Sequence, residues 1–163
     1  MNDLVKSIAE QMEINFENAR VMLLTYDANA LICGACAWRY AYHALHSCDR
    51  WLFNPSQYTQ PDFHIGNMDN PDAPTDVTLD DEVLMNYLAS VRAKARAYLA
   101  SLTDEMLTEK PTDCEYSRLE LILGQFRHLS FHIGMVNGIT IGRTGKFPRF
   151  RGLENTHSTD LYE

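Results

Sequence analysis

Hydrophobic residues recur with a helical period in four separate stretches of the chain. In residues 3–26, apolar side chains return every three or four positions, while most charged residues lie on another face. Asn2 or Asp3 is placed to cap this helix at its N-terminus. Residues 34–53 are apolar nearly all the way round, which predicts a helix surrounded by others. The stripe of the first stretch comprises Val5, Ile8, Met12, Phe16, Ala19, Met22 and Tyr26.

Two further helices are predicted in the second half of the chain. The third begins at Thr78, whose hydroxyl can cap its first turn, and ends at the segment SLTDEML (101–107), which ends the helix or forms a short extra turn. The fourth begins with the capping box of Ser117 and Glu120 and ends at Gly138 or Gly142. Their apolar stripes are Val83, Tyr87, Val91, Ala95 and Tyr98, followed by Leu119, Ile122, Phe126, Leu129, Ile133 and Val136.

The segment between the second and third helices has no usable period. Residues 54–77 contain four of the six prolines of the chain. A loop of this length is either functional or a connection between distant ends of a bundle, and both interpretations stay open. No alternating strand pattern and no internal repeat is evident. We therefore predict an all-α protein, with a four-helix bundle in residues 1–141 and a C-terminal tail in residues 142–163.

Composition and charge indicate which kinds of partner and which cellular compartment to expect. The 163 residues include 14 Lys and Arg against 22 Asp and Glu, a net charge of −8, which argues against nucleic acid as a partner. The longest nearly apolar run, residues 30–38, is far shorter than the ~20 residues of a membrane helix. The N-terminus does not resemble a secretory signal, and four cysteines then indicate reduced thiols. We expect a cytoplasmic protein without a membrane partner.

Two histidines are spaced one helical turn apart in the segment RHLSFHIG. His128 and His132 lie outside the main apolar stripe, on a second line that begins with Leu121 and ends with Met135. The apolar residues at both ends of this line indicate that a neighbouring element partly covers it. Two imidazoles at this spacing can reach one metal ion, although such pairs are more often incidental.

The second helix supplies more polar side chains than its apolar character explains. His43, His46, Cys48 and Asp49 all fall within the segment YHALHSCDRW. Buried imidazoles need partners, because burial without a hydrogen bond is unfavourable. Either a metal ion or a carboxylate can satisfy them, and the residues alone leave both alternatives open.

Together, the segments WRYAYHALHSCDRWLF and RHLSFHIG resemble the DinB-like (YfiT-like) metal-binding helical bundles. The resemblance covers residues 3–141 and implies an up-down-down-up bundle with three histidines around one divalent ion. It places the first ligand at His43, which follows the aromatic pair, and the other two at His128 and His132. His46, one turn from His43, is the rival for the first ligand.

A three-histidine site leaves positions on the ion open for water or a substrate. Such ligands suit zinc and nickel, and by affinity order copper, with Asp49 as a candidate acceptor for the second ring nitrogen of a ligand. The resemblance implies a metal-dependent transferase or isomerase that uses a low-molecular-weight thiol such as bacillithiol or mycothiol, or a related hydrolase, and it assigns no catalytic residue. The alternative is a non-enzymatic module of the stress response that binds a metal or small ligand. Family analogy also implies a homodimer.

Other motifs carry weaker signals. Cys33 and Cys36 have the spacing of a redox dithiol at a helix start, but small core residues are the more common explanation, and Cys114 stands alone. A di-iron site is disfavoured because ENTH, at residues 154–157, is the only Glu-x-x-His segment. His64 and His157 receive no role. The tail carries basic and aromatic residues that can cover the metal site, bind an anion, contact a second subunit or remain solvated: Arg143, Lys146, Phe147, Arg149, Phe150 and Arg151.

Overall fold

The computed structural model describes residues 2–153 and 159–163, and its architecture is the predicted all-α arrangement of four helices. A two-stranded hairpin and two short 3-10 helices lie in the connections between the main helices. The four main helices are α1 (Asp3–Thr25), α2 (Ala37–Trp51), α3 (Asp81–Ser101) and α4 (Arg118–Thr144). The smaller elements are β1 (Leu31–Ile32), β2 (Ala35–Cys36), η1 (Pro55–Gln57) and η2 (Glu105–Thr108).

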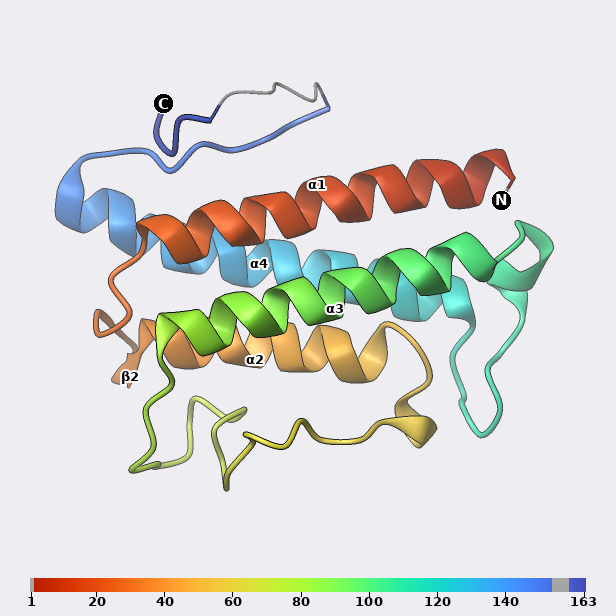
Figure 1. Ribbon diagram of the computed structural model, residues 1–163, viewed down its shortest axis with the longest axis horizontal. Coiled ribbons are helices and arrows are strands. Elements are labelled where there is room, and N and C mark those ends of the chain that lie inside the picture. Colours follow the sequence, from red (N-terminus) through yellow and green to blue (C-terminus); the bar gives the residue numbers. More distant parts are fainter. Residues whose placement is uncertain (1, 154–158) are drawn as a thin grey trace.

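The helices run up, down, down and up along the long axis of the molecule (Figure 1). Both α1 and α2 pack against α3 and against α4. Because α2 and α3 point the same way, the chain must return along the whole bundle between them. Residues 52–80 make this return beneath α2 and α3, so the proline-rich loop is a crossover connection.

The core contains the stripes that the sequence predicts. On α1, Val5, Met12 and Phe16 are almost completely buried, while Ile8 packs at the edge of the core. Helix α2 is buried on most of its surface, in agreement with its apolar character, because α3, α4 and the crossover loop surround it. The loop contributes the fully buried side chain of Met68, which anchors its middle to the bundle.

The helix ends follow the sequence signals only in part. The capping box of Ser117 and Glu120 is present at the start of α4, and η2 forms the predicted extra turn after α3. The prediction for Thr78 is wrong, because α3 begins with Asp80 as its N-cap. The predicted stop at Gly138 or Gly142 is also wrong. Helix α4 continues to Thr144, and the following Gly145 caps it with a φ of 68°, the left-handed conformation that ends helices.

The hairpin before α2 was not predicted, because strands of two residues show no alternation. Its turn consists of Cys33 and Gly34, both with positive φ, as in tight two-residue hairpin turns. Cys33 is therefore exposed in a turn, neither in the core nor at a helix start, while Cys36 is the N-cap of α2. All four cysteines are free thiols.

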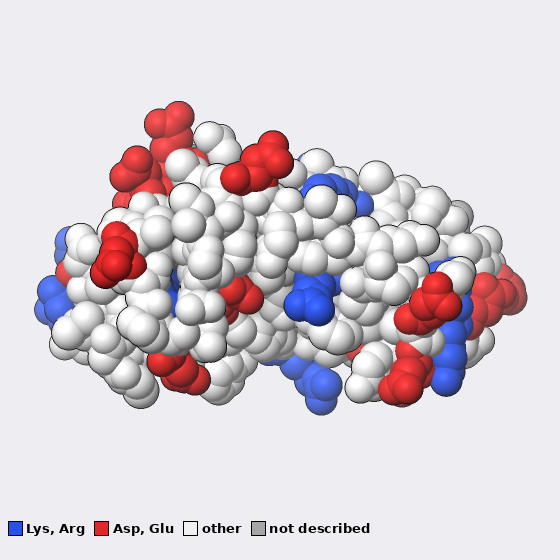
Figure 2. Space-filling view, turned by 90° about the horizontal axis from the view of Figure 1, so that it is seen from below, with Lys and Arg blue, Asp and Glu red and all other residues white. Residues whose placement is uncertain are grey.

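Among the described residues, no helix has an apolar stretch that could cross a bilayer. On the face that carries the crossover loop, acidic and basic side chains lie among one another, some in contact and others surrounded by uncharged residues (Figure 2). Neither sign forms an extended patch on this face.

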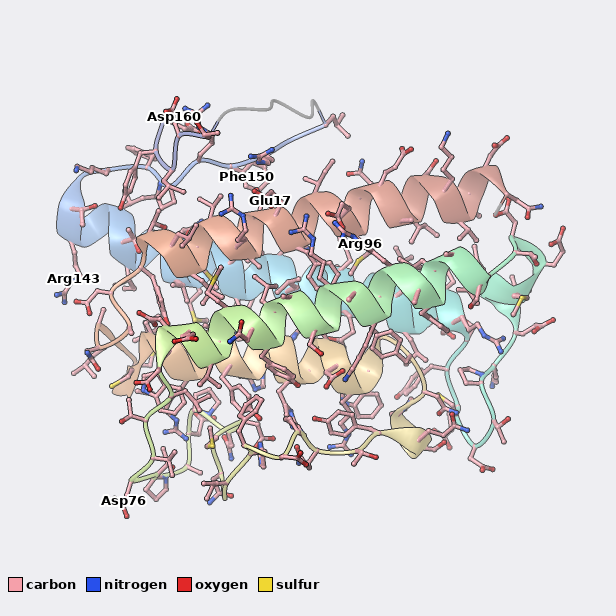
Figure 3. The ribbon with its side chains drawn as sticks, in the orientation of Figure 1. Glu17, Asp76, Arg96, Arg143, Phe150 and Asp160 are labelled. Carbon is pink, nitrogen blue, oxygen red and sulfur yellow. The ribbon has the colours of Figure 1, made fainter. Side chains whose placement is uncertain are left out.

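The described part of the tail folds back along α1 (Figure 1). Asn18 of α1 and the backbone of Arg151 exchange two hydrogen bonds of 3.0 and 2.8 Å. Arg151 also pairs with Glu17 of α1 at 3.4 Å, and Figure 3 shows Phe150 on the tail segment that runs along α1. Two further backbone bonds join residues 147 and 149 to residues 163 and 161. These tail residues therefore cover α1, not the predicted metal site between α2 and α4.

Candidate metal centre

Three histidine side chains from two packed helices converge on one point. His43 comes from α2, and His128 and His132 come from successive turns of α4, which packs against α2. The Nε2 atom of His128 lies 3.1 Å from Nε2 of His43 and 3.1 Å from Nε2 of His132. The ligand atoms of all three residues lie within 4.8 Å of one another, so the cluster could hold a metal ion.

The spacing of the nitrogens fits a shared ion. Two nitrogens bound to zinc at about 2.0–2.1 Å with a tetrahedral angle lie about 3.3 Å apart. The two contacts of 3.1 Å are close to that value. The three rings meet edge to face, with centroids 4.5 to 4.9 Å apart, so that they do not stack on one another.

Protons alone cannot satisfy these contacts. Nδ1 of His43 lies 2.6 Å from the backbone carbonyl oxygen of Asp69, which can only accept a hydrogen bond, so the neutral ring carries its proton there. Its Nε2 lone pair therefore points to the cluster. A proton on Nε2 of His128 or of His132 makes one linear hydrogen bond, which leaves the other contact of His128 unsatisfied. A cation can accept all three lone pairs at once.

The surroundings keep His128 and His132 uncharged. Burial, with a smaller contribution from His43, lowers the pKa of His128 to about 4. Burial, together with His128 and His43, lowers the pKa of His132 to about 3. At neutral pH both rings are therefore free bases with a lone pair available. Their Nδ1 atoms are buried without a hydrogen-bond partner, so among the three rings it is His43 that a backbone acceptor orients.

We expect the metal-free protein to lose stability as the pH falls below neutrality. Unfolded histidine titrates near pH 6.5, whereas folded His128 and His132 titrate near pH 4 and 3. Between these values the unfolded chain binds more protons, so the free energy of unfolding decreases from about pH 7 to about pH 4. Urea unfolding at a series of pH values, in the presence of a chelator, measures this loss.

The matched control for this pH dependence is the double variant His128→Ala and His132→Ala. The double variant is expected to lose less stability between pH 7 and pH 4 than the wild type, because among the described histidines only the lowered pKa of buried His46 still acts there. An identical pH profile for the wild type and the double variant would contradict the assignment of the acid sensitivity to these rings.

A buried arginine fixes the loop that carries the acceptor of His43. Arg39 of α2 is only 7% exposed, and its guanidinium donates to the backbone carbonyls of Asn67, Asn70 and Pro71. Together with the buried side chain of Met68, these bonds hold the loop on both sides of Asp69. Arg39 thereby places the Asp69 carbonyl against His43 without contacting the imidazole itself.

His46, the rival for the first ligand, lies outside the cluster. Its Nε2 atom is 2.7 Å from Oε1 of Gln60, and its ring stacks on that of His64 with centroids 5.1 Å apart. Both rings face the carboxylate of Asp69, at 3.8 and 3.7 Å. The structure brings His43, not His46, together with the two histidines of α4.

The proposed role of Asp49 as acceptor is wrong. Its carboxylate accepts bonds from the Tyr87 hydroxyl at 3.0 Å and from Lys94 Nζ at 2.7 Å. The acceptor of His43 is instead a backbone carbonyl in the loop, which no side-chain pattern can reveal. Arg39 and Asp69 were missed for the same reason, because their function depends on how the crossover loop folds.

Among the described residues, the candidate cluster consists of these three histidines. The thiol of Cys48 on α2 is fully buried, and burial raises its pKa to about 12, so it stays protonated at neutral pH. His157 and the ENTH segment lie outside the described residues. Comparisons with protein-family models, with curated proteins and with solved structures yield no match for this chain.

Proposed function

We propose that the protein binds one divalent metal ion through His43, His128 and His132. The observation that carries this proposal is the convergence of three Nε2 atoms whose mutual contacts protons cannot all satisfy. Neutral imidazoles favour zinc or nickel among the divalent ions. The ion in turn supplies a Lewis acid that lowers the pKa of a bound water or thiol.

We further propose that the site is used in thiol chemistry, as a metal-dependent S-transferase or isomerase in the cytoplasm. The basis is the resemblance of the two histidine segments to the DinB-like bundles, together with the up-down-down-up order of the helices. The substrate is a low-molecular-weight thiol of the bacillithiol or mycothiol type. Three protein ligands leave room for it, and His43 and His128 remain partly exposed to solvent.

One observation favours the alternative, a non-enzymatic module that binds a metal or a small ligand as a homodimer. The cavities of about 300, 380, 550 and 700 Å³ are lined by residues other than the three histidines. Small-molecule sites are typically concave, and the three histidines line none of these four cavities. Light scattering of the purified protein tests the dimer.

A thiol-transfer screen separates the two functions. The zinc-loaded and nickel-loaded wild type is incubated with bacillithiol, mycothiol or glutathione and the electrophile 1-chloro-2,4-dinitrobenzene. We expect conjugation above the uncatalysed rate with one of the thiols, and none with the matched His132→Ala protein. Full metal occupancy without turnover of any thiol would reject the transferase and favour the binding module.

A further inference from the structure

A second candidate site lies at the C-terminal end of α2. A cavity of about 550 Å³ forms where the end of α2, the helix η1, the C-terminal part of α3 and the start of α4 meet. Residues 111 and 112 complete its wall, and none of the three clustered histidines lines it. Its volume is in the range of small-molecule sites, about 300–1,000 Å³.

Aromatic rings form part of the wall. Phe53 and Tyr98 meet edge to face, with ring centroids 5.3 Å apart, and Tyr58 of the crossover loop lines the same cavity. Burial raises the pKa of Tyr58 to about 12, so its hydroxyl stays neutral. These rings offer a surface for a flat apolar or aromatic body.

Two cationic side chains also line the cavity, Lys94 and Arg118, against one carboxylate, Asp49. Lys94 forms an ion pair with Asp49, and the other oxygen of this carboxylate accepts a bond from Tyr87. An ammonium group has three N–H donors, and Lys94 uses one of them on Asp49. Arg118 bonds Met106 and Glu109 from the same terminal nitrogen of its guanidinium. The lining thus holds two cations against one carboxylate, while Glu109 pairs with Arg118 from outside the lining, and Lys94 keeps N–H donors that no described residue uses.

A hydroxyl in the wall has no acceptor for its hydrogen. The oxygen of Tyr98 is buried, and its polar neighbour is the Arg118 guanidinium, which can only donate. Burial raises the pKa of Tyr98, against a smaller opposing effect of the neighbouring Arg118, so the group is a neutral O–H donor. A buried donor without an acceptor is unfavourable, and a ligand oxygen in the cavity can supply that acceptor.

We infer that this cavity binds a small aromatic carboxylate, with its ring against Phe53, Tyr58 and Tyr98 and its carboxylate near Lys94, Arg118 and the Tyr98 hydroxyl. A neutral aromatic leaves the cationic donors unused, and a small aliphatic acid leaves the rings uncovered. An aromatic acid satisfies both parts of the wall.

The test compares 2-naphthoate with its neutral amide, 2-naphthamide, by isothermal titration calorimetry on the full chain. We expect saturable binding of 2-naphthoate, at least about tenfold tighter than that of 2-naphthamide, because charge-assisted bonds are lost with the amide. Equal affinity for the two compounds, or no binding of 2-naphthoate at millimolar concentration, would overturn the proposal.

Three variants locate the ligand. Lys94→Gln is expected to weaken 2-naphthoate at least about tenfold, and Lys94→Arg, which keeps the charge, much less. Tyr98→Phe removes a hydroxyl that has no acceptor in the free protein, so we expect weaker binding with little change in the melting temperature. Unchanged affinity in both Lys94→Gln and Tyr98→Phe would place the ligand elsewhere and reject the site.

His132→Ala separates this inference from the proposed metal function. The variant is expected to bind 2-naphthoate with the affinity of the wild type, because the histidines do not line the cavity. Loss of 2-naphthoate binding in His132→Ala would mean that the carboxylate coordinates the metal, which overturns the second site and supports the first.

Discussion

Replacing His128 by alanine is expected to leave the protein without a stoichiometrically bound divalent ion. His128 is the central member of the cluster, since its Nε2 atom lies 3.1 Å from that of each of the other two histidines. The remaining pair supplies two ligands for an ion that takes at least three protein ligands in zinc sites. Elemental analysis after loading with zinc or nickel and desalting measures the loss.

The same substitution is expected to remove the thermal stabilisation that the metal gives. An ion present at about 100 times its dissociation constant stabilises the folded state by about 2.7 kcal/mol, or roughly 5–10 °C for a chain of this size. This gap between loaded and chelated protein disappears in His128→Ala. Without metal, His128→Ala is expected to be nearly as stable to heat as the metal-free wild type, because the substitution also removes the unsatisfied contacts of His128.

The control for His128→Ala is His46→Gln, which changes the histidine that hydrogen-bonds Gln60 outside the cluster. His46→Gln should retain the ion and the stabilisation that the ion gives, whereas His43→Ala should lose both. If His128→Ala keeps the metal content of the wild type, or if His46→Gln loses it while His43→Ala does not, the assignment of the three ligands is wrong.

The helices could be predicted from the sequence because burial imposes a period on it. The positions of Met12, Phe16 and Ile122 in the core follow from spacing alone. The hydrophobic period does not determine the order in which the helices pack. The up-down-down-up order was predicted from the resemblance of the histidine segments to a known family. That resemblance also placed His43 ahead of His46, a choice that the apolar pattern of α2 leaves open.

The features that were missed depend on backbone geometry and tertiary contacts. Gly138, Gly142 and Gly145 look alike in the sequence, yet only Gly145 takes a positive φ and ends α4. The acceptor of His43 is the carbonyl of Asp69, a group that every residue possesses. Its position depends on the crossover loop, whose course is fixed by contacts far apart in the chain.

Replacing Arg39 by methionine is expected to weaken metal binding although Arg39 contacts none of the three histidines. The side chain holds three loop carbonyls, and without these bonds the segment around Asp69 loses its fixed position. Loss of the partner that orients a ligating histidine typically lowers metal affinity about 10–100-fold. Competition titration with a chromophoric zinc chelator measures this change.

Arg39→Met is also expected to destabilise the fold by about 2–4 kcal/mol. Hydrogen bonds from a charged donor contribute about 1.5–3 kcal/mol each to stability. Hydration of the freed loop carbonyls offsets part of this loss. The matched control is Arg50→Met on the same helix, where the arginine is exposed and lies over the Trp51 ring. It removes the same charge from α2 and is expected to change affinity and stability little. Equal losses of metal affinity in the two variants would attribute the effect to net charge. Destabilisation of Arg39→Met with wild-type metal affinity would show that the position of the loop does not affect metal binding by His43.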